Sequence, residues 1–225
     1  MAHQLLYDFV RDLSQAIELP EPIVEFGSMQ VEEGQPNDLR SLFAGRDFVG
    51  TDFREGPGVD RVEDLRGLTY GDGEVGTALC LDTLEHCADP LTACRELRRV
   101  TAEGGVCVIS SVWLIGVHAH PNDYWRFTPE GFRLLLEGLD DVQVAAWGDP
   151  QIPYFVFAAG AKGRPLGTDI AALPSLAAQQ ESWRRAEGQL RVGPFRYPLR
   201  DMAKLLAREL PRAAGERARA RLARQ

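Results

Sequence analysis

The chain has 225 residues, of which 44% are hydrophobic, 26% charged and 8% aromatic. This composition excludes a disordered or fibrous protein, and the length predicts one domain with an appendage, large enough to bury a core without disulfide or metal support. No stretch approaches the roughly 20 apolar residues of a membrane span, and Asp8, Arg11 and Asp12 interrupt the apolar run that a secretory signal would need. We therefore expect a soluble, cytoplasmic protein with no membrane partner.

The formal net charge of −8 is unevenly distributed along the chain. Residues 162–225 contain 14 Lys and Arg against 6 Asp and Glu, whereas residues 1–161 contain 11 against 27. An acidic body repels phosphates, so we expect no nucleic-acid partner. The basic residues of the tail are interleaved with Ala and Leu, which favours a solvated helical face over a site for an anionic partner.

The four cysteines, Cys80, Cys87, Cys94 and Cys107, form no CxxC pair, and no histidines stand at a spacing typical of zinc ligands. Cys80 and Cys107 fall inside apolar runs that predict buried strands. We expect no metal and no disulfide, and interpret these residues as small buried side chains in a reducing compartment.

Apolar residues recur at helical spacing over residues 3–19, and prolines end this predicted first helix. Short apolar runs then predict seven strands, at residues 22–28, 47–52, 59–65, 75–82, 106–113, 142–148 and 153–160. Further helices are predicted between strands, at residues 37–45, 90–103 and 128–139. Asn37 and Thr128 are the expected N-caps of two of them, and Gly104-Gly105 the expected end of the helix over 90–103.

Strands that alternate with helices at this spacing predict an α/β fold with a doubly wound, mostly parallel sheet. The last two strands are separated by too few residues for a crossover helix, so we expect an antiparallel hairpin at the sheet edge. From Gly163 onward the composition becomes rich in Ala, Arg and Gln, which predicts helices over 169–187 and 198–222.

These patterns divide the chain into a main domain, residues 1–162, and a C-terminal helical extension, residues 163–225. An apolar stripe in the extension predicts a helix that packs on the body or on a second subunit, which leaves a homodimer open. Its residues are Met202, Leu205, Leu206 and Leu210.

Open parallel sheets bind ligands beyond the carboxyl ends of their strands, so the residues that follow each strand are the candidate binding residues. They are Glu25, Phe26, Gly27 and Ser28 after the first strand, Asp52 and Phe53 after the second, Asp64 and Leu65 after the third, and Leu81, Asp82 and His86 after the fourth. Taken singly, such a glycine is more often a turn and such an aspartate a helix cap. Taken together they suit a nucleoside, with a carboxylate for a ribose diol and an acceptor beside an apolar surface for adenine.

Five stretches carry a resemblance to a known family: VEFGS, FVGTDF, GVDRVEDL, CLDTLEHCADPLTACRELRRVTAEGGVCVISS and HPNDYWRFTPEGF. Over roughly residues 20–160 the chain resembles class I S-adenosylmethionine (SAM) dependent methyltransferases of the broad type 11 kind. The block from Leu81 to Ser111 is its most specific part. The resemblance implies a Rossmann-like fold, SAM as the cofactor and a methyltransferase activity.

The same resemblance implies roles for individual residues. Glu25 and Gly27 would flank the methionine part of SAM, Asp52 would bind the ribose hydroxyls and Asp64 the adenine amino group, and Leu81-Asp82 would line the sulfonium side.

The glycine loop departs from the family's G-x-G-x-G pattern, because Gly27 is followed by Met29, Gln30 and Val31 and the next glycine is Gly34. This departure keeps an alternative open, namely a catalytically inactive binding or scaffold protein that has lost SAM. An oxidoreductase is disfavoured, because the chain lacks the fuller glycine fingerprint and a Tyr-x-x-x-Lys pair.

The loop after the fifth strand contains two of the four histidines and is the expected acceptor site. His118 or His120 is a candidate general base near neutral pH, and Asp123 a candidate to orient it. His86 is a second histidine near the cofactor, interpreted more readily as a structural member of its turn.

The same loop contains candidate substrate-binding residues. Tyr124 and Trp125 could wall a pocket, and Arg126 could hold an anionic group. Alternatively, Asp123 and Arg126 pair with each other while Trp125 and Phe127 pack under the loop, and packing is the preferred role for these two aromatic residues. The expected function is methyl transfer to oxygen or nitrogen of a small-molecule or sugar-like acceptor. The sequence specifies neither the acceptor nor the oligomeric state.

Overall fold

The computed structural model describes residues 2–30, 38–118, 122–185, 189–192, 195–198, 203–204 and 207–208. Seven strands form one sheet in the order β3-β2-β1-β4-β5-β7-β6. The bounds are β1 Ile23–Phe26, β2 Phe48–Asp52, β3 Arg61–Val62, β4 Val75–Leu81, β5 Thr101–Val112, β6 Gln143–Gly148 and β7 Pro153–Ala161. The first five strands are parallel, and β7 is antiparallel to both β5 and β6. The predicted doubly wound sheet with an antiparallel edge hairpin is confirmed.

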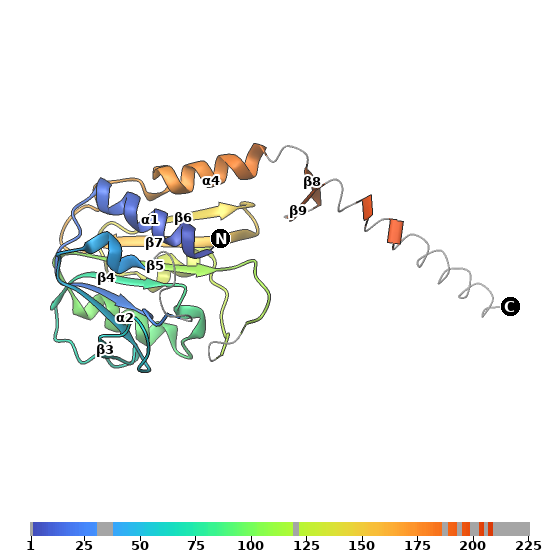
Figure 1. Ribbon diagram of the computed structural model, residues 1–225. Coiled ribbons are helices and arrows are strands. Elements are labelled where there is room, and N and C mark those ends of the chain that lie inside the picture. Colours follow the sequence, from blue (N-terminus) through green and yellow to red (C-terminus); the bar gives the residue numbers. More distant parts are fainter. Residues whose placement is uncertain are drawn as a thin grey trace. The chain divides into compact units, whose positions relative to one another are not determined.

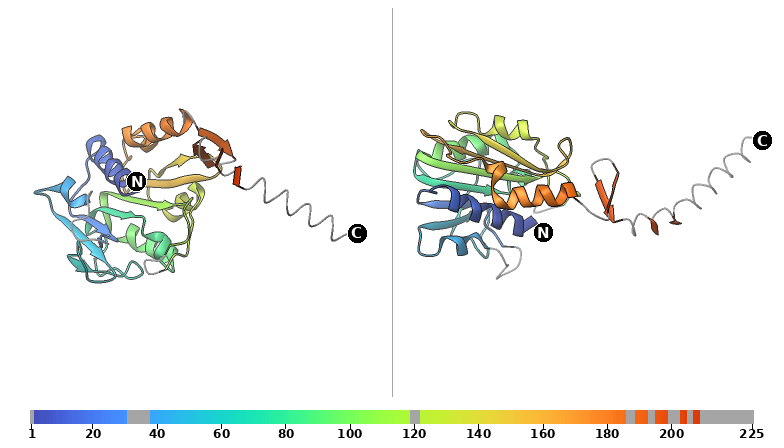
Figure 2. Two further views of the ribbon diagram at one scale, coloured as in Figure 1. Left: turned by 45° about the vertical axis from the view of Figure 1, so that its right-hand side comes forward. Right: turned by 90° about the horizontal axis from the view of Figure 1, so that it is seen from above.

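Helices cover both faces of this sheet (Figure 1). The α-helices are α1 Ala2–Ala16, α2 Pro90–Val100, α3 Pro129–Leu135 and α4 Pro174–Arg185, and the 3-10 helices are η1 Leu39–Phe43, η2 Leu84–His86 and η3 Ile170–Ala172. Helices α1 and α4 lie side by side on one face (Figure 2), where the backbone N–H of Ser175 donates to the Asp12 carboxylate at 2.6 Å. Helices α2 and α3 pack on the opposite face.

The core consists of two apolar layers, one on each face of the sheet. On the first face, the apolar stripe of α1 meets inward side chains of β5 and β7, and the rings of Phe9 and Phe157 lie 4.7 Å apart with neither exposed. Leu166, Ile170 and Leu173 also belong to this layer. Burial of each such side chain contributes roughly 1.5–3 kcal/mol, so the segment after β7 is held firmly on the sheet.

The chain divides into two units, residues 1–180 and residues 181–225. The first contains the whole seven-stranded sheet. In the second, the described residues form an antiparallel hairpin of β8 Gln189–Val192 and β9 Phe195–Pro198, which the sequence patterns did not predict. The expected domain boundary between residues 162 and 163 stays a prediction, while the two structural units divide near residue 180.

Two predicted helices end or begin differently from expectation. The helix over 37–45 is the 3-10 helix η1, and its N-cap is Asp38, whose side chain accepts from the backbone N–H of Arg40; Asn37 lies outside the described residues. Helix α3 ends at Leu135, whereas its expected N-cap, Thr128, is confirmed by a hydrogen bond from the backbone N–H of Gly131.

The expectation that Gly104-Gly105 ends a helix is wrong. Helix α2 ends at Val100, and Thr101 is extended and begins β5. The register between β4 and β5 shifts between Val75 and Thr77, and Gly105 lies so close to the Gly76 carbonyl that a Cβ there would meet it at 2.7 Å. The glycine pair therefore allows the two strands to approach closely where their pairing is irregular.

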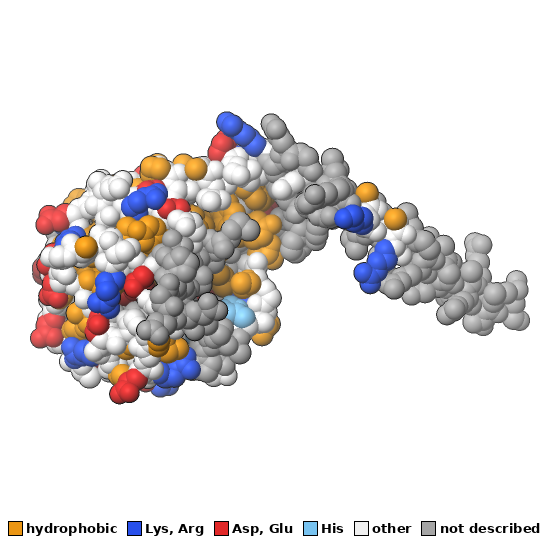
Figure 3. All heavy atoms as spheres, viewed as in Figure 1, with side chains coloured by type: hydrophobic (Ala, Val, Ile, Leu, Met, Phe, Trp, Pro, Cys, Tyr) orange, Lys and Arg blue, Asp and Glu red, His pale blue; other side chains and the backbone are white. Residues whose placement is uncertain are grey.

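The predicted helix over 169–187 is divided into η3 and α4, because Pro174 begins a new helix. The helix expected over 198–222 and the stripe of Met202, Leu205, Leu206 and Leu210 lie outside the described residues, apart from short pieces. No helix in the part of the chain that the structure describes is long and apolar enough to cross a membrane. On the face drawn in Figure 3, acidic and basic side chains are interspersed over the first unit.

Candidate functional site

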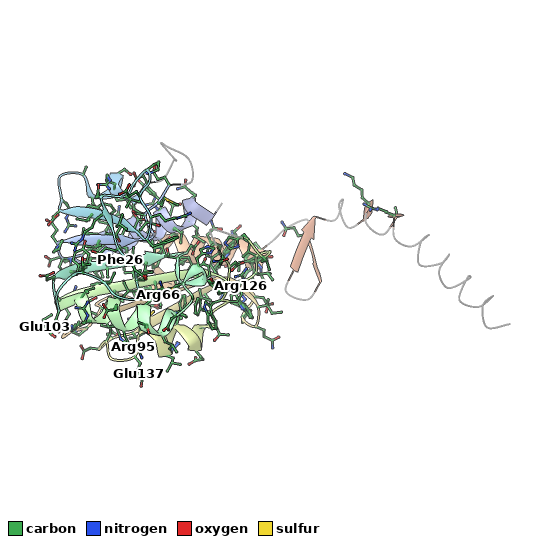
Figure 4. All side chains as sticks on the ribbon, turned by 90° about the horizontal axis from the view of Figure 1, so that it is seen from below. Phe26, Arg66, Arg95, Glu103, Arg126 and Glu137 are labelled. Carbon is green, nitrogen blue, oxygen red and sulfur yellow. The ribbon has the colours of Figure 1, made fainter. Side chains whose placement is uncertain are left out.

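A cavity of about 630 Å³ opens at the carboxyl ends of the parallel strands. Every residue that the sequence singled out for cofactor binding lines it: Glu25, Phe26, Gly27, Ser28, Asp52, Phe53, Asp64, Leu65, Leu81, Asp82 and His86. Figure 4 shows that Arg126 and Glu103 lie at opposite ends of the sheet, with Arg126 at the end that carries the cavity. The structure thus brings the predicted binding residues together, while their individual roles stay predictions.

Gly27 forms the turn after β1 with a backbone φ of +92°, a conformation that disfavours side chains. Its N–H donates to the Thr51 carbonyl at 2.7 Å. A Cβ at this position would lie 2.1 Å from Oγ1 of Thr83, which follows β4. The glycine is therefore required both by the turn and by the close approach of the neighbouring strand end.

Two glycines in the loop between β2 and β3 lie close to the residues that follow Gly27. Met29 packs against Gly56, where a Cβ would meet its sulfur at 2.9 Å, and the Ser28 hydroxyl donates to the Gly58 carbonyl at 2.9 Å. Gly58 itself has a φ of +82° and lies against the Ser28 carbonyl. The side chain of Met29 is thus accommodated by the facing loop, and the cavity stays open.

The two carboxylates predicted to bind the nucleoside differ in their surroundings. Asp52 is half-buried in the wall, and burial raises the pKa of its carboxyl group. Asp64 is more exposed and binds the Arg66 guanidinium at 2.7 and 3.0 Å, which lowers the pKa of the Asp64 carboxyl group. An adenine amino group at Asp64 would therefore share this carboxylate with Arg66.

Asp82 has a backbone φ of 45°, a conformation that is uncommon for residues other than glycine. Residues held in such conformations are concentrated at functional sites. The Ser110 hydroxyl donates to its carboxylate at 2.8 Å, and burial raises the pKa of Asp82 to about 6. This conformation directs the chain from β4 into η2, and residues of both elements line the cavity.

Glu25 contributes a carboxyl group from β1, and burial raises its pKa to about 8. Because the unfolded chain releases this proton near 4.5, the folded protein holds more protons between about pH 5 and 8. Its free energy of unfolding should therefore fall as the pH rises through that window. We expect Glu25→Gln to remove on the order of 1–3 kcal/mol of this pH dependence, measured by denaturant unfolding at several pH values without ligand.

Glu130→Gln is the matched control, because Glu130 lies on α3 with its side chain 84% exposed. A wild-type and a Glu25→Gln protein with parallel pH profiles would show that Glu25 ionises normally.

On the other side of the cavity, the loop after β5 is held against η2 by three hydrogen bonds. The His86 Nδ1 lies 2.5 Å from the Asn122 carbonyl, and the backbone N–H of Tyr124 donates to the Glu85 carbonyl at 2.8 Å. The indole N–H of Trp125 donates to the Cys87 carbonyl at 2.9 Å. These bonds bring two distant segments of the chain into one wall.

His118 lines the cavity with its side chain 31% exposed. Its Nδ1 lies 3.2 Å from the Asp123 carboxylate, and its backbone N–H also donates to that carboxylate, at 3.0 Å. Arg126 donates to both oxygens of Asp123 at 2.5 and 2.7 Å and lowers the pKa of this carboxyl group far below its usual range. Asp123 is therefore an anion placed to orient His118. His120, the other candidate base, lies outside the described residues.

The three candidate substrate-binding residues occupy different places. Tyr124 lines the cavity and is 51% exposed. Trp125 bonds to Cys87 and Arg126 to Asp123, and neither is among the described residues that line the cavity. The internal Asp123–Arg126 pair that the sequence left open is present, and contact of Trp125 or Arg126 with an acceptor stays a prediction.

The candidate list from the sequence omits Glu85. Its side chain is 1% exposed, lines the cavity and accepts from the Ser111 hydroxyl at 3.0 Å. Burial raises the pKa of Glu85 to about 8. Its position in the turn directly after a buried strand, beside His86, was the available signal.

The sheet order with its antiparallel β7 and the cavity at the strand ends define the class I methyltransferase fold. Solved structures support this. A SAM-dependent methyltransferase from Archaeoglobus fulgidus matches with a TM-score of 0.54 and 12% identity, over 71% of this chain and 94% of that one. Another from Mesorhizobium loti matches with a TM-score of 0.52 and 14% identity, over 68% of this chain and 96% of that one. No curated protein matches the sequence.

One stretch of the sequence also matches a known protein family. Residues 45–109 match the protein family described as "Methyltransferase domain". The matched stretch lies within the region, roughly residues 20–160, whose motifs predicted a SAM-dependent methyltransferase.

Proposed function

We propose that the protein transfers the methyl group of SAM to an oxygen or nitrogen of a small-molecule or sugar-like acceptor. The observation that supports this best is one cavity lined both by carboxyl groups from β1 and β2 and by Glu85, His86 and His118. A cationic nucleoside and a neutral acceptor can meet in such a space.

The residues suit SAM chemically. Glu25 is a carboxyl group for the ammonium, Asp52 offers two acceptors for the ribose diol, and Leu65 and Leu81 are apolar surfaces. When bound, SAM supplies a methyl group activated by a positively charged sulfur, and the remaining demand on the protein is alignment and exclusion of water.

On the acceptor side, His118 is the candidate to receive the acceptor's proton. Its Nδ1 faces two acceptors, the Asp123 carboxylate and the Gly116 carbonyl at 3.3 Å, so the proton of the neutral ring belongs on Nδ1. The lone pair is then on Nε2. Asp123 would stabilise the imidazolium that forms after proton transfer.

Surface charge and the cysteines bear on the partners and on the site of action. Acidic and basic side chains are interspersed among the described residues on the face drawn in Figure 3, which favours a small-molecule acceptor over a nucleic acid. The four cysteines are free thiols, three of them buried, which supports a reducing compartment and a cytoplasmic site of action.

Calorimetric titration with SAM and with its demethylated product, S-adenosylhomocysteine, tests the cofactor assignment. We expect binding at micromolar affinity or better, and about a 10- to 100-fold weaker affinity in Asp52→Ala, because a carboxylate hydrogen bond contributes about 1.5–3 kcal/mol.

Glu130→Gln should bind as the wild type does. Absence of heat at millimolar ligand would favour the inactive scaffold instead, and an unchanged affinity in Asp52→Ala would remove that residue from the site.

A further inference from the structure

The acceptor side of the cavity brings together three side chains of the kinds that bind metal ions. Glu85, His86 and His118 each offer one ligand atom, and these atoms lie within 4.8 Å of one another. All three residues line the cavity. They come from η2 and from the loop after β5. The group is therefore created by the fold of the chain rather than by a local sequence motif.

Hydrogen bonds fix which nitrogen of each ring carries the lone pair. The Nδ1 of His86 faces the Asn122 carbonyl at 2.5 Å, and a carbonyl can only accept, so this nitrogen carries the proton. The Nδ1 of His118 likewise faces only acceptors, the Gly116 carbonyl and the Asp123 carboxylate. Both rings therefore present Nε2 as the ligand atom, which is the tautomer of many metal-binding histidines.

Each of the three side chains is supported by an outer partner. His118 has the Asp123 carboxylate, which Arg126 holds in turn; His86 has the Asn122 carbonyl; and Glu85 has the Ser111 hydroxyl. Metal-ligating histidines almost always donate their second N–H to a carboxylate or a backbone carbonyl. The two rings also lie edge to face with centroids 4.9 Å apart, which keeps them adjacent.

We propose that Glu85, His86 and His118 bind one divalent transition-metal ion. Two imidazoles and one carboxylate suit Zn²⁺, Co²⁺ or Fe²⁺ better than the hard ions Mg²⁺ and Ca²⁺. Bonds of about 2.0–2.2 Å at tetrahedral angles place ligand atoms about 3.3–3.6 Å apart, so binding draws together any pair that lies near the 4.8 Å limit.

Three protein ligands leave coordination positions open toward the cavity, where an oxygen or nitrogen of the acceptor would complete the site. This consequence, unlike the metal binding itself, rests on the proposed methyl transfer. With an ion present, His118 serves as a ligand, and its role as a proton acceptor is confined to the metal-free enzyme.

The test uses the full-length protein, freed of metal by a chelator and dialysed, and titrated with Co²⁺ by visible absorption and with Zn²⁺ by calorimetry. We expect one equivalent of each ion, with ligand-field bands for Co²⁺. His118→Ala and Glu85→Gln should weaken Zn²⁺ binding by more than tenfold, and Asp123→Asn by about 10- to 100-fold as an outer partner.

Binding of S-adenosylhomocysteine to the same samples reports whether each variant is folded, and Glu130→Gln should bind Zn²⁺ as the wild type does. Wild-type protein that binds S-adenosylhomocysteine but takes up no Co²⁺ at millimolar concentration would overturn the metal site, as would variants with unchanged affinity. Uptake of metal without any nucleoside binding would support the metal site and contradict the methyltransferase function.

Discussion

Replacement of His118 by alanine should lower kcat roughly 10²- to 10⁴-fold while the affinity for S-adenosylhomocysteine stays within about twofold of wild type. The physical reason is position: His118 lines the acceptor side of the cavity and is oriented by the buried Asp123, whereas the carboxylates expected to bind SAM follow other strands. Loss of the imidazole removes a group that acts on the acceptor and leaves the nucleoside contacts in place.

The measurement is SAM turnover with the first acceptor found by screening hydroxyl and amine compounds for release of S-adenosylhomocysteine. Glu130→Gln is the control, since its exposed side chain lies on α3 outside the cavity lining. A His118→Ala protein that binds the nucleoside and turns over at the wild-type rate would contradict both a proton-accepting and a metal-ligating role.

The sequence predicted the sheet well because its signals are local and strong. Strands β4 and β7 are nearly continuous apolar runs, which identifies them as central, and the short interval before Pro153 forbids a crossover helix. Since the carboxyl ends of parallel strands share one edge, residues such as Asp52 and Asp82 could be assigned to one cavity without knowledge of their side-chain contacts.

The features that the sequence did not reveal depend on contacts between distant segments. Glu85 and His118 are far apart in the chain and meet only because the loop after β5 bonds to η2. Gly56 and Gly58 make room for Met29 and for the Ser28 carbonyl from the facing loop, a contact that no pattern in the first turn indicates. The Asp64–Arg66 pair is a local contact in the turn after β3 that the sequence analysis did not predict, and the role of Asp64 toward adenine stays a prediction.

The predicted end of helix α2 was wrong because a helical sequence pattern and strand pairing compete for the same residues. The residues Thr101 to Glu103 continue a helical pattern, yet pairing of Thr101 with Val75 extends β5 into them. Strand pairing in a buried sheet stabilises the backbone more than weak local helix propensity does. The sequence pattern alone reports the local helix propensity and contains no information on the strand pairing.

A second large effect is expected for Gly27→Ala, which should lower the free energy of unfolding by about 2–4 kcal/mol and abolish measurable nucleoside binding. Two costs combine here. A backbone φ of +92° is strained for alanine, and the new methyl group would lie 2.1 Å from the Thr83 hydroxyl and 2.9 Å from its Cβ. Relief of the contact requires movement of the β1 turn or of the β4 end, and both line the cavity.

Gly138→Ala separates the two costs, because Gly138 has a similar φ of +101° but no atom within 4 Å of a Cβ built there. It should lose only about 1–2 kcal/mol, the cost of the backbone conformation, and keep nucleoside binding. Thr83→Gly in the Gly27→Ala background should restore part of the lost stability by removing the contact. Denaturant unfolding and calorimetry of the four proteins measure both effects. Equal stability and equal nucleoside affinity of Gly27→Ala and Gly138→Ala would show that the two strand ends do not approach as closely as described.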